Sequence, residues 1–184
     1  MIDTSSHHLV YGKLTDFITG TTLKDTDDER IRQKLAKFLI NDLGYKKSEI
    51  EPRLTINTIF NNNRVKTTID FTICIKKKRL FIIRYGPGSL ISREKAAISA
   101  ARVLDEKYRI PLAIVTNGYD AKLIETKKGK VLSKGMSSIP DRTKAEILIK
   151  KMEFIAYNNL VKREMALRVL NVFDQEVCCV GTKC

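Results

Sequence analysis

The sequence predicts an α/β protein in which a helix, a three-stranded meander, a crossover helix and a fourth strand follow one another, with a C-terminal helical extension. Two observations carry this prediction. Apolar and polar residues alternate from Val65 to Ile73, and a continuous apolar run covers Leu80 to Ile83, as in two paired strands. Before and after these strands, apolar residues recur at intervals of three and four, which is typical of helices.

The first predicted helix begins in an acidic segment at residues 25–29 and ends at Gly44. Thr26 and Glu29 have the spacing of a capping box, and acids are favoured at a helix start by the helix dipole. Alternation over residues 48–60 then predicts the first strand, which turns into the next through asparagines 61–63. Residues 1–24 are an N-terminal segment that fits either an edge hairpin or a loop.

The second half of the predicted meander and its crossover follow from turn residues. A basic turn, Lys76–Arg79, joins the second and third strands, and the Gly and Pro residues at 86–88 end the third. A helix capped by Ser89 or Ser92 is expected to run to near Tyr108.

The chain then continues with a buried strand, a hairpin and a helical region. An apolar strand is expected over residues 110–116 and two short strands around residues 127–129. Pro140 and Asp141 open a helical region expected to reach about Gln175. We therefore divide the chain into an N-terminal segment (1–24), a central domain (25–140) and a C-terminal helical extension (141–184).

Composition indicates a basic protein. Lys and Arg outnumber Asp and Glu by 34 to 21, giving a net charge of +13, which is the electrostatic footprint of a nucleic-acid binder, although a solvated charged surface would look similar. No run of about 18 apolar residues occurs, and the N-terminal residues lack the pattern of a signal peptide. We expect a soluble, cytoplasmic protein that does not associate with membranes.

The cysteines do not have the spacing of a zinc site, because no C-x-x-C pair occurs. Cys74 is expected in the core, and the role of the other three is left open: Cys178, Cys179 and Cys184. Basic residues gather in predicted turns and are candidates for phosphate contacts. They are Lys46, Lys47, Lys76, Lys77, Lys78, Arg79, Lys127, Lys128 and Lys130.

Four segments together resemble a known family. They are D-D-E-R-I-R-Q-K-L-A-K-F-L-I-N-D-L-G-Y, I-D-F-T-I around Asp70, P-G-S-L-I-S-R-E-K-A-A-I-S-A-A-R-V-L, and P-L-A-I-V-T-N-G-Y-D-A-K-L-I-E-T. The chain resembles the N-terminal nuclease domain of type I restriction enzyme R subunits, over roughly residues 25–140. The resemblance implies a restriction-endonuclease-like PD-(D/E)XK core that acts on DNA.

In that family, a strand acid, a Glu-x-Lys on the next strand and often a helix acid hold Mg²⁺ and position an attacking water. Hard divalent cations take oxygen ligands, and a lysine stabilises negative charge on phosphate or water. By the resemblance, Asp70 is the strand acid, and Glu29, or less favourably Asp28, is the helix acid. Asp70 and Glu29 would then bind Mg²⁺ if the protein is active.

The third strand departs from the family pattern. Depending on register, the Glu-x-Lys positions hold either Ile83 and Tyr85 or Arg84 and Gly86. The family's Gln-x-x-x-Tyr motif on the following helix is also missing, since alanines stand at the corresponding positions, 96 and 100. We therefore expect an inactive relative that needs no cofactor and binds nucleic acid, with DNA favoured.

Three alternatives stay open. Glu94 and Lys95 at the start of the crossover helix could replace the missing Glu and Lys in an active Mg²⁺-dependent endonuclease. Asp70 could be paired with Arg84 or Lys66, and Arg84 could instead bind a phosphate. Finally, an apolar stripe from Ala145 to Leu170 could make a homodimer or bind a partner, so that the protein acts through its C-terminal helices.

Overall fold

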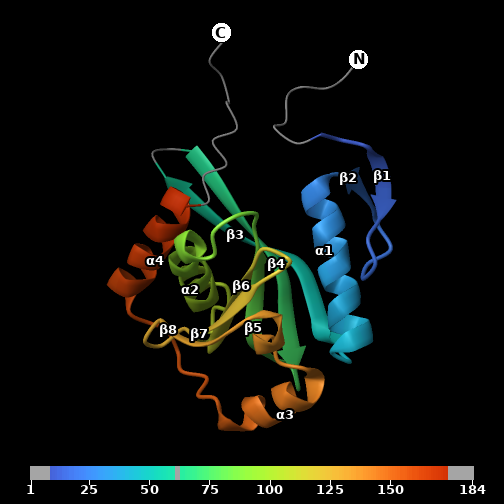
Figure 1. Cartoon of the computed structure of the whole chain (residues 1–184). Helices are drawn as coiled ribbons and strands as arrows, with labels where there is room; N and C mark the ends of the chain where they lie inside the picture. The colour runs from blue at the N-terminus through green and yellow to red at the C-terminus, as the bar shows by residue number, and fades with distance from the viewer. Residues whose placement is uncertain (1–8, 61–62, 174–184) are drawn as a thin grey trace.

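A computed structural model describes residues 9–60 and 63–173 of the chain. Within this part, the protein is a mixed α/β structure with a six-stranded sheet, a separate two-stranded hairpin and four α-helices (Figure 1). The strands are β1 (Gly12–Thr15), β2 (Thr22–Asp25), β3 (Ile50–Phe60), β4 (Asn63–Ile75), β5 (Lys78–Tyr85), β6 (Leu112–Thr116), β7 (Ala121–Glu125) and β8 (Lys130–Lys134). The helices are α1 (Asp27–Lys37), α2 (Glu94–Val103), α3 (Arg142–Lys151) and α4 (Leu160–Phe173).

The six-stranded sheet has the order β3-β4-β5-β6-β7-β8. All neighbours are antiparallel except β5 and β6, which are parallel because α2 carries the chain back across the sheet between them. The predicted order of helix, three-stranded meander, crossover helix and fourth strand is therefore present. The hairpin predicted after the fourth strand is β7 and β8.

The helices form layers on the two faces of the sheet. α1 lies on one face, whereas α2 and α4 lie together on the other (Figure 1). Leu39, Phe81 and Ile83 are fully buried on the α1 side, and Ile82 and Ala100 on the α2 side. Each fully buried large apolar side chain contributes about 1.5–3 kcal/mol, so the two cores fix which face each strand residue presents.

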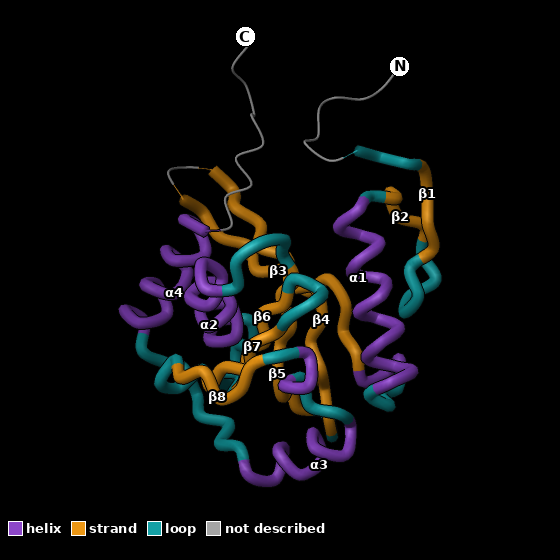
Figure 2. The backbone as a smooth tube through the Cα atoms, in the orientation of Figure 1, coloured by secondary structure: helices purple, strands orange, loops and turns teal. Residues whose placement is uncertain are grey.

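The described part of the N-terminal segment forms a hairpin, but this hairpin is a separate two-stranded sheet and not an edge of the six-stranded sheet. β1 and β2 pair with each other and lie on the outer side of α1, away from the six-stranded sheet (Figure 2). α1 begins as expected, because the Thr26 side chain accepts a hydrogen bond from the Glu29 backbone N–H at 3.2 Å. The expected capping box is only half formed, since the Glu29 carboxylate bonds to other side chains.

Three boundaries differ from the predictions. The turn between β4 and β5 comprises Lys76 and Lys77, both with positive φ, and Arg79 already belongs to β5. α2 spans Glu94–Val103, starts without a side-chain cap and ends before Tyr108. The chain leaves the helix there because the Ile110 N–H returns to the Ala101 carbonyl.

The C-terminal extension is two helices where one continuous region was expected. Residues 152–159 are not helical, and the Asn159 side chain caps α4 by accepting from the Lys162 N–H at 2.9 Å. α3 buries Ala145 and Ile149 on the α1 side, whereas α4 buries Ala166 and Leu170 against α2. The predicted stripe is thus divided between two cores.

Some predictions fall outside the described residues. These concern Gln175, Cys178, Cys179 and Cys184. Cys74 lies in β4 and is partly buried, and burial raises the pKa of its thiol. Among the described helices, none has the length and apolar character needed to cross a membrane.

Candidate functional site

Asp70 lies in β4 and its side chain is buried, with the residue only 6% exposed. One carboxylate oxygen accepts the Tyr85 backbone N–H at 2.7 Å, and the other accepts Nε of Arg32 at 2.5 Å. The pairing of Asp70 with Arg84 or Lys66, weighed from the sequence, is therefore wrong. The cation comes from α1 because Asp70 points to the α1 face of the sheet.

Glu29 lies in the first turn of α1 and is 8% exposed. Its carboxylate accepts from an Arg53 terminal nitrogen at 2.5 Å and from Gln33 Nε2 at 2.8 Å, and it lies 3.8 Å from Arg32 Nη1. Glu29 and Asp70 therefore contact the same Arg32 guanidinium. The two carboxylates are therefore close enough for one guanidinium group to contact both. Whether they bind a metal ion stays a prediction.

Arg32 connects the two carboxylates. Burial acts to lower the pKa of its guanidinium, but the charge of Asp70 and its hydrogen bond outweigh burial, so the pKa is raised. The guanidinium carbon also lies 5.2 Å from the centre of the Tyr85 ring, within the range of a cation–π contact. Arg32 is thus a permanently charged group fixed from three sides.

Arg53 reaches the same cluster from β3. Arg53 has a φ of +54°, an uncommon conformation for a residue other than glycine. The β3–β4 ladder pairs Pro52 with Phe71 and Leu54 with Ile69, and Arg53 between them is left out of the pairing. The register of the two strands is the same on both sides of this break, and the Arg53 guanidinium reaches Glu29 and, at 2.9 Å, Asp16. Strained residues held in this way concentrate at functional sites.

Asp16 closes the far side of the cluster. Burial acts to raise the pKa of its carboxyl group, but hydrogen bonds from the Thr19 N–H, Gln33 and the Ile18 N–H outweigh burial, and the pKa is lowered. Among the described residues, the cluster therefore holds three buried acids, Asp16, Glu29 and Asp70, connected by two arginines, Arg32 and Arg53.

Tyr85 occupies the place that the resemblance assigns to the lysine of Glu-x-Lys. Ile83 and Tyr85 both pack in the core on the α1 side, so these two residues, and not Arg84 and Gly86, share the face of Asp70. The Tyr85 hydroxyl donates to Asp28 at 3.0 Å. Burial first, and then this hydrogen bond, raise the pKa of Tyr85 to about 12.

Arg84 alternates along β5 with Ile83 and Tyr85, which pack in the core on the α1 side, so its side chain points to the α2 face. It lines a cavity of about 200 Å³ next to α2 with Ser92 and Arg93, and Tyr85 also reaches this cavity. Gly86 follows, and a side chain there would collide with Arg93, since an added Cβ would lie 2.3 Å from the Arg93 guanidinium carbon.

Glu94 and Lys95, the candidates for a migrated Glu and Lys, are not brought to Asp70. The Glu94 carboxylate pairs with Nζ of Lys122 in β7 at 2.5 Å, and Lys95 is exposed. Lys122 alternates with the α1-side residues Ala121 and Leu123, so the pair lies on the α2 face. The sheet separates it from Asp70.

The residues around Asp70 do not fit a magnesium ion. Mg²⁺ requires near-octahedral oxygen coordination, whereas Asp70 and Glu29 are each occupied by a guanidinium and Ile83 offers no ligand. In the described ranges, no group of three or more Asp, Glu, His or Cys side chains is arranged to hold a metal ion.

The basic turns lie at the other end of the sheet. Asp70 and Tyr85 lie near the end of β5, whereas the turns that contain Lys47, Lys76 and Lys127 lie where β3, β5 and β8 begin. From Asp70 to the end of β4 is five residues, about 16 Å. A phosphate held by these turns would therefore not lie against Asp70.

Several of the basic residues already have partners within the protein. Arg79 pairs with Glu51 at 2.7 Å and Asp105 at 3.2 Å, and Lys47 donates to the Phe17 carbonyl. Lys46 and Lys128 are exposed. Arg79 is therefore a structural residue, while the exposed lysines retain their charge for a ligand.

Comparison with known proteins supports the family that the sequence resembles. A family model described as "Type I restriction enzyme R protein N terminus" matches residues 27–140. No curated protein and no solved structure is significantly similar to the chain.

Proposed function

Because the chain belongs to the family of type I restriction enzyme R protein N-termini, we propose that it is a nuclease-like protein that binds nucleic acid, DNA foremost, without cleaving it. We further propose that its sheet and helices form a restriction-endonuclease-like core. The element order supports this, since a meander and a crossover helix bring an acid of β4 beside β5 and α1.

The position of Arg32 is the observation that carries the proposal. Its guanidinium lies between Asp70 and Glu29, the two acids that would hold the cation in an active relative. A guanidinium neutralises carboxylates, but it cannot bind and acidify a water molecule as a metal ion can. Ile83 and Tyr85 add neither a carboxylate nor a lysine, so we expect no activated water and no lysine to stabilise the phosphate.

The charge of the chain supports nucleic-acid binding. The net charge is +13, and exposed lysines such as Lys46, Lys76 and Lys128 lie at one end of the sheet. Contacts of this kind release counterions and carry little sequence preference. We expect affinity for DNA to fall steeply between about 50 and 200 mM salt.

Two assays test the proposal together. A plasmid-nicking assay with Mg²⁺ and with Mn²⁺ is expected to show no cleavage by the wild-type protein or by Asp70→Ala. A gel-shift titration at low salt is expected to show binding by both proteins. Cleavage by the wild type that Asp70→Ala abolishes would contradict the proposed inactivity, and an absence of binding at low salt would remove nucleic acid from the proposal.

The active alternative has its own variant. If Glu94 and Lys95 supplied the missing groups, Glu94→Ala would abolish cleavage as Asp70→Ala would. The Glu94–Lys122 ion pair on the other face of the sheet argues against this alternative.

A non-catalytic interaction role is the second candidate function. One face of α4 packs against α2. The rest of the helix exposes large apolar side chains, namely Leu160, Val161, Met165 and Val172. Light scattering at increasing protein concentration tests whether this surface forms a homodimer.

A further inference from the structure

A basic pocket lies between α2, the β7–β8 hairpin and α4. It has a volume of about 420 Å³, which is the size of a small-molecule site. Arg102, Arg109, Lys127 and Lys162 line it with positive charge, and Tyr157 and Met165 give it an apolar wall. It lies at the start of β6, at the opposite end of the sheet from Asp70.

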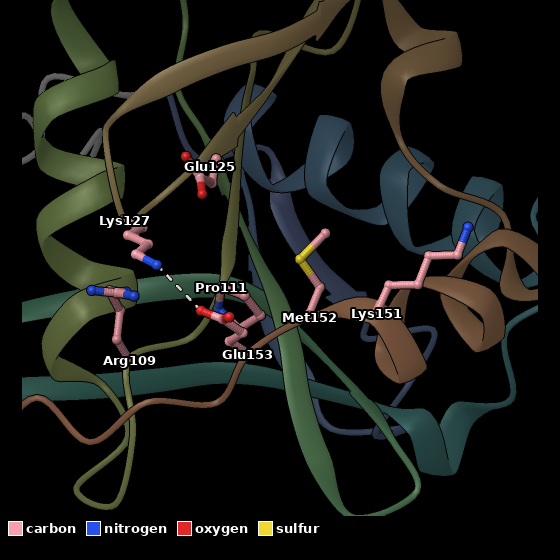
Figure 3. Close-up of a pocket in the computed structure, with 7 residues that line it drawn as sticks. All are labelled: Arg109, Pro111, Glu125, Lys127, Lys151, Met152 and Glu153. Atoms are coloured by element: carbon pink, nitrogen blue, oxygen red, sulfur yellow. Dashed lines mark hydrogen bonds and ion pairs between the residues drawn. The ribbon is translucent and has the colours of Figure 1, made fainter.

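Arg109 is the central residue, because it also lines an adjoining cavity of about 280 Å³. Figure 3 shows Arg109 and Lys127 on the same side of that cavity, with Lys151 on the far side. Lys127 pairs with Glu153 at 3.2 Å, but both side chains are at least half exposed, so this pair can open at little cost.

One nitrogen of the Arg109 guanidinium has no hydrogen-bond partner among the residues that the structure describes. This nitrogen, Nε, is buried, and no carboxylate of the described residues lies within ion-pair distance of the guanidinium. Burial first, and then the nearby charge of Arg102, lower the pKa of Arg109. Glu125 and Glu153 act on Arg109 in the opposite direction, but among the described residues neither forms an ion pair with it. Four basic side chains and no carboxylate line the larger pocket, so it is expected to attract an anion.

The neighbouring groups suit an anion with several acceptor oxygens. The Arg102 guanidinium is held in place by the carbonyls of Thr126 and Lys127, at 2.9 and 3.4 Å. Ser99, which is buried in α2, also lines the pocket. Arginine forks match the oxygens of phosphate, and an apolar wall with a tyrosine ring suits a planar base.

We propose that this pocket binds a nucleoside phosphate, with the phosphate at Arg102 and Arg109 and the base against Tyr157 and Met165. The same chemistry is offered by a free mononucleotide and by a nucleotide within a nucleic-acid strand. The inference uses no residue of the Asp70 cluster, so it stands or fails independently of the proposed inactive nuclease.

Calorimetric titration in phosphate-free buffer at low salt tests the pocket with three probes: adenosine monophosphate, adenosine and a short single-stranded oligonucleotide. The matched variants are Arg109→Gln and Lys134→Gln, which each remove one positive charge. Lys134 is an exposed residue of β8, in the same hairpin, and it does not line the pocket. The phosphate-bearing probe is expected to bind at least about tenfold more weakly to Arg109→Gln, and less than about twofold more weakly to Lys134→Gln.

The probes distinguish the source of the phosphate. Binding of the monophosphate that depends on Arg109 identifies a free nucleotide, whereas Arg109-dependent binding of the oligonucleotide alone identifies a strand. Equal effects of both variants, or equal affinity for adenosine and its monophosphate without Arg109-dependent oligonucleotide binding, would overturn the proposal. The unliganded Arg109→Gln protein is expected to melt no lower than the wild type, because the change removes an unpaired charge, so loss of binding would not reflect unfolding.

Discussion

Replacing Arg32 by Met removes the cation that Asp70 and Glu29 share. Asp70 would keep the Tyr85 N–H but lose its charge partner, while remaining 6% exposed. Breaking a buried ion pair from one side costs about 3–5 kcal/mol, and since the Arg32 side chain is 28% exposed, water can offset part of this. We expect a loss of about 2–4 kcal/mol in the free energy of unfolding, or about 5–12 °C in Tm.

Urea unfolding followed by circular dichroism measures this loss, with Arg30→Met as the matched control. Arg30 lies in the same helix and pairs with Asp25, but its side chain is 48% exposed, so its loss should change the free energy of unfolding much less than the loss of Arg32. Adding Asp70→Asn to Arg32→Met should recover about 1–3 kcal/mol, because no bare carboxylate is left. If Arg32→Met costs no more than Arg30→Met, the cluster does not depend on Arg32.

Two further predictions concern the surroundings of Asp70. Gly118→Ala should lower the free energy of unfolding by about 2–4 kcal/mol, because the added Cβ would lie 2.7 Å from Ile31 Cγ2 and the residue has a φ of +89°. Gly88 has a similar φ of +81° but no atom near the added Cβ, so Gly88→Ala should lower it by only about 1–2 kcal/mol. Equal losses of the two variants in urea unfolding would exclude the collision at Gly118. Because the pKa of Tyr85 is raised to about 12 against about 10 in the unfolded chain, its contribution to stability should be complete below about pH 10 and lost as the pH rises to about 12. A pH series of unfolding free energies should therefore fall less steeply over this range for Tyr85→Phe than for the wild type, and identical slopes would contradict the raised pKa.

Sequence periodicity was sufficient for most of the fold. The alternation from Val65 to Ile73 and the apolar run at Leu80 predicted β4 and β5, because sheet burial imposes a period of two. The division of the C-terminal region into α3 and α4 was missed. Apolar spacing continues across residues 152–159, where the Arg109 N–H donates to the Ile155 carbonyl and the Asn159 side chain caps the start of α4.

The candidate site was only partly predictable. Asp70 and Glu29 stood out as acids in the expected elements, but Arg32 did not, since an arginine three residues after a glutamate is the usual pattern of an exposed helical ion pair. Arg53 was invisible for a different reason. Its approach depends on a left-handed conformation within a strand, and an arginine, unlike a glycine or an asparagine, does not signal that conformation in a sequence.

If the protein is inactive, as we propose, the Asp70 cluster has kept its acids without the chemistry that uses them in an active relative. Buried carboxylates must be neutralised for the sheet and α1 to pack, and a metal ion or a guanidinium can do this. Only the metal has open coordination positions where a water molecule can lose a proton. Arg32 lies 2.5 Å from Asp70 and near the Tyr85 ring. It neutralises the carboxylate, as packing requires, but it cannot activate a water molecule. Mutating the metal-binding acids of an active enzyme would abolish cleavage, whereas in this protein the same change should mainly lower stability.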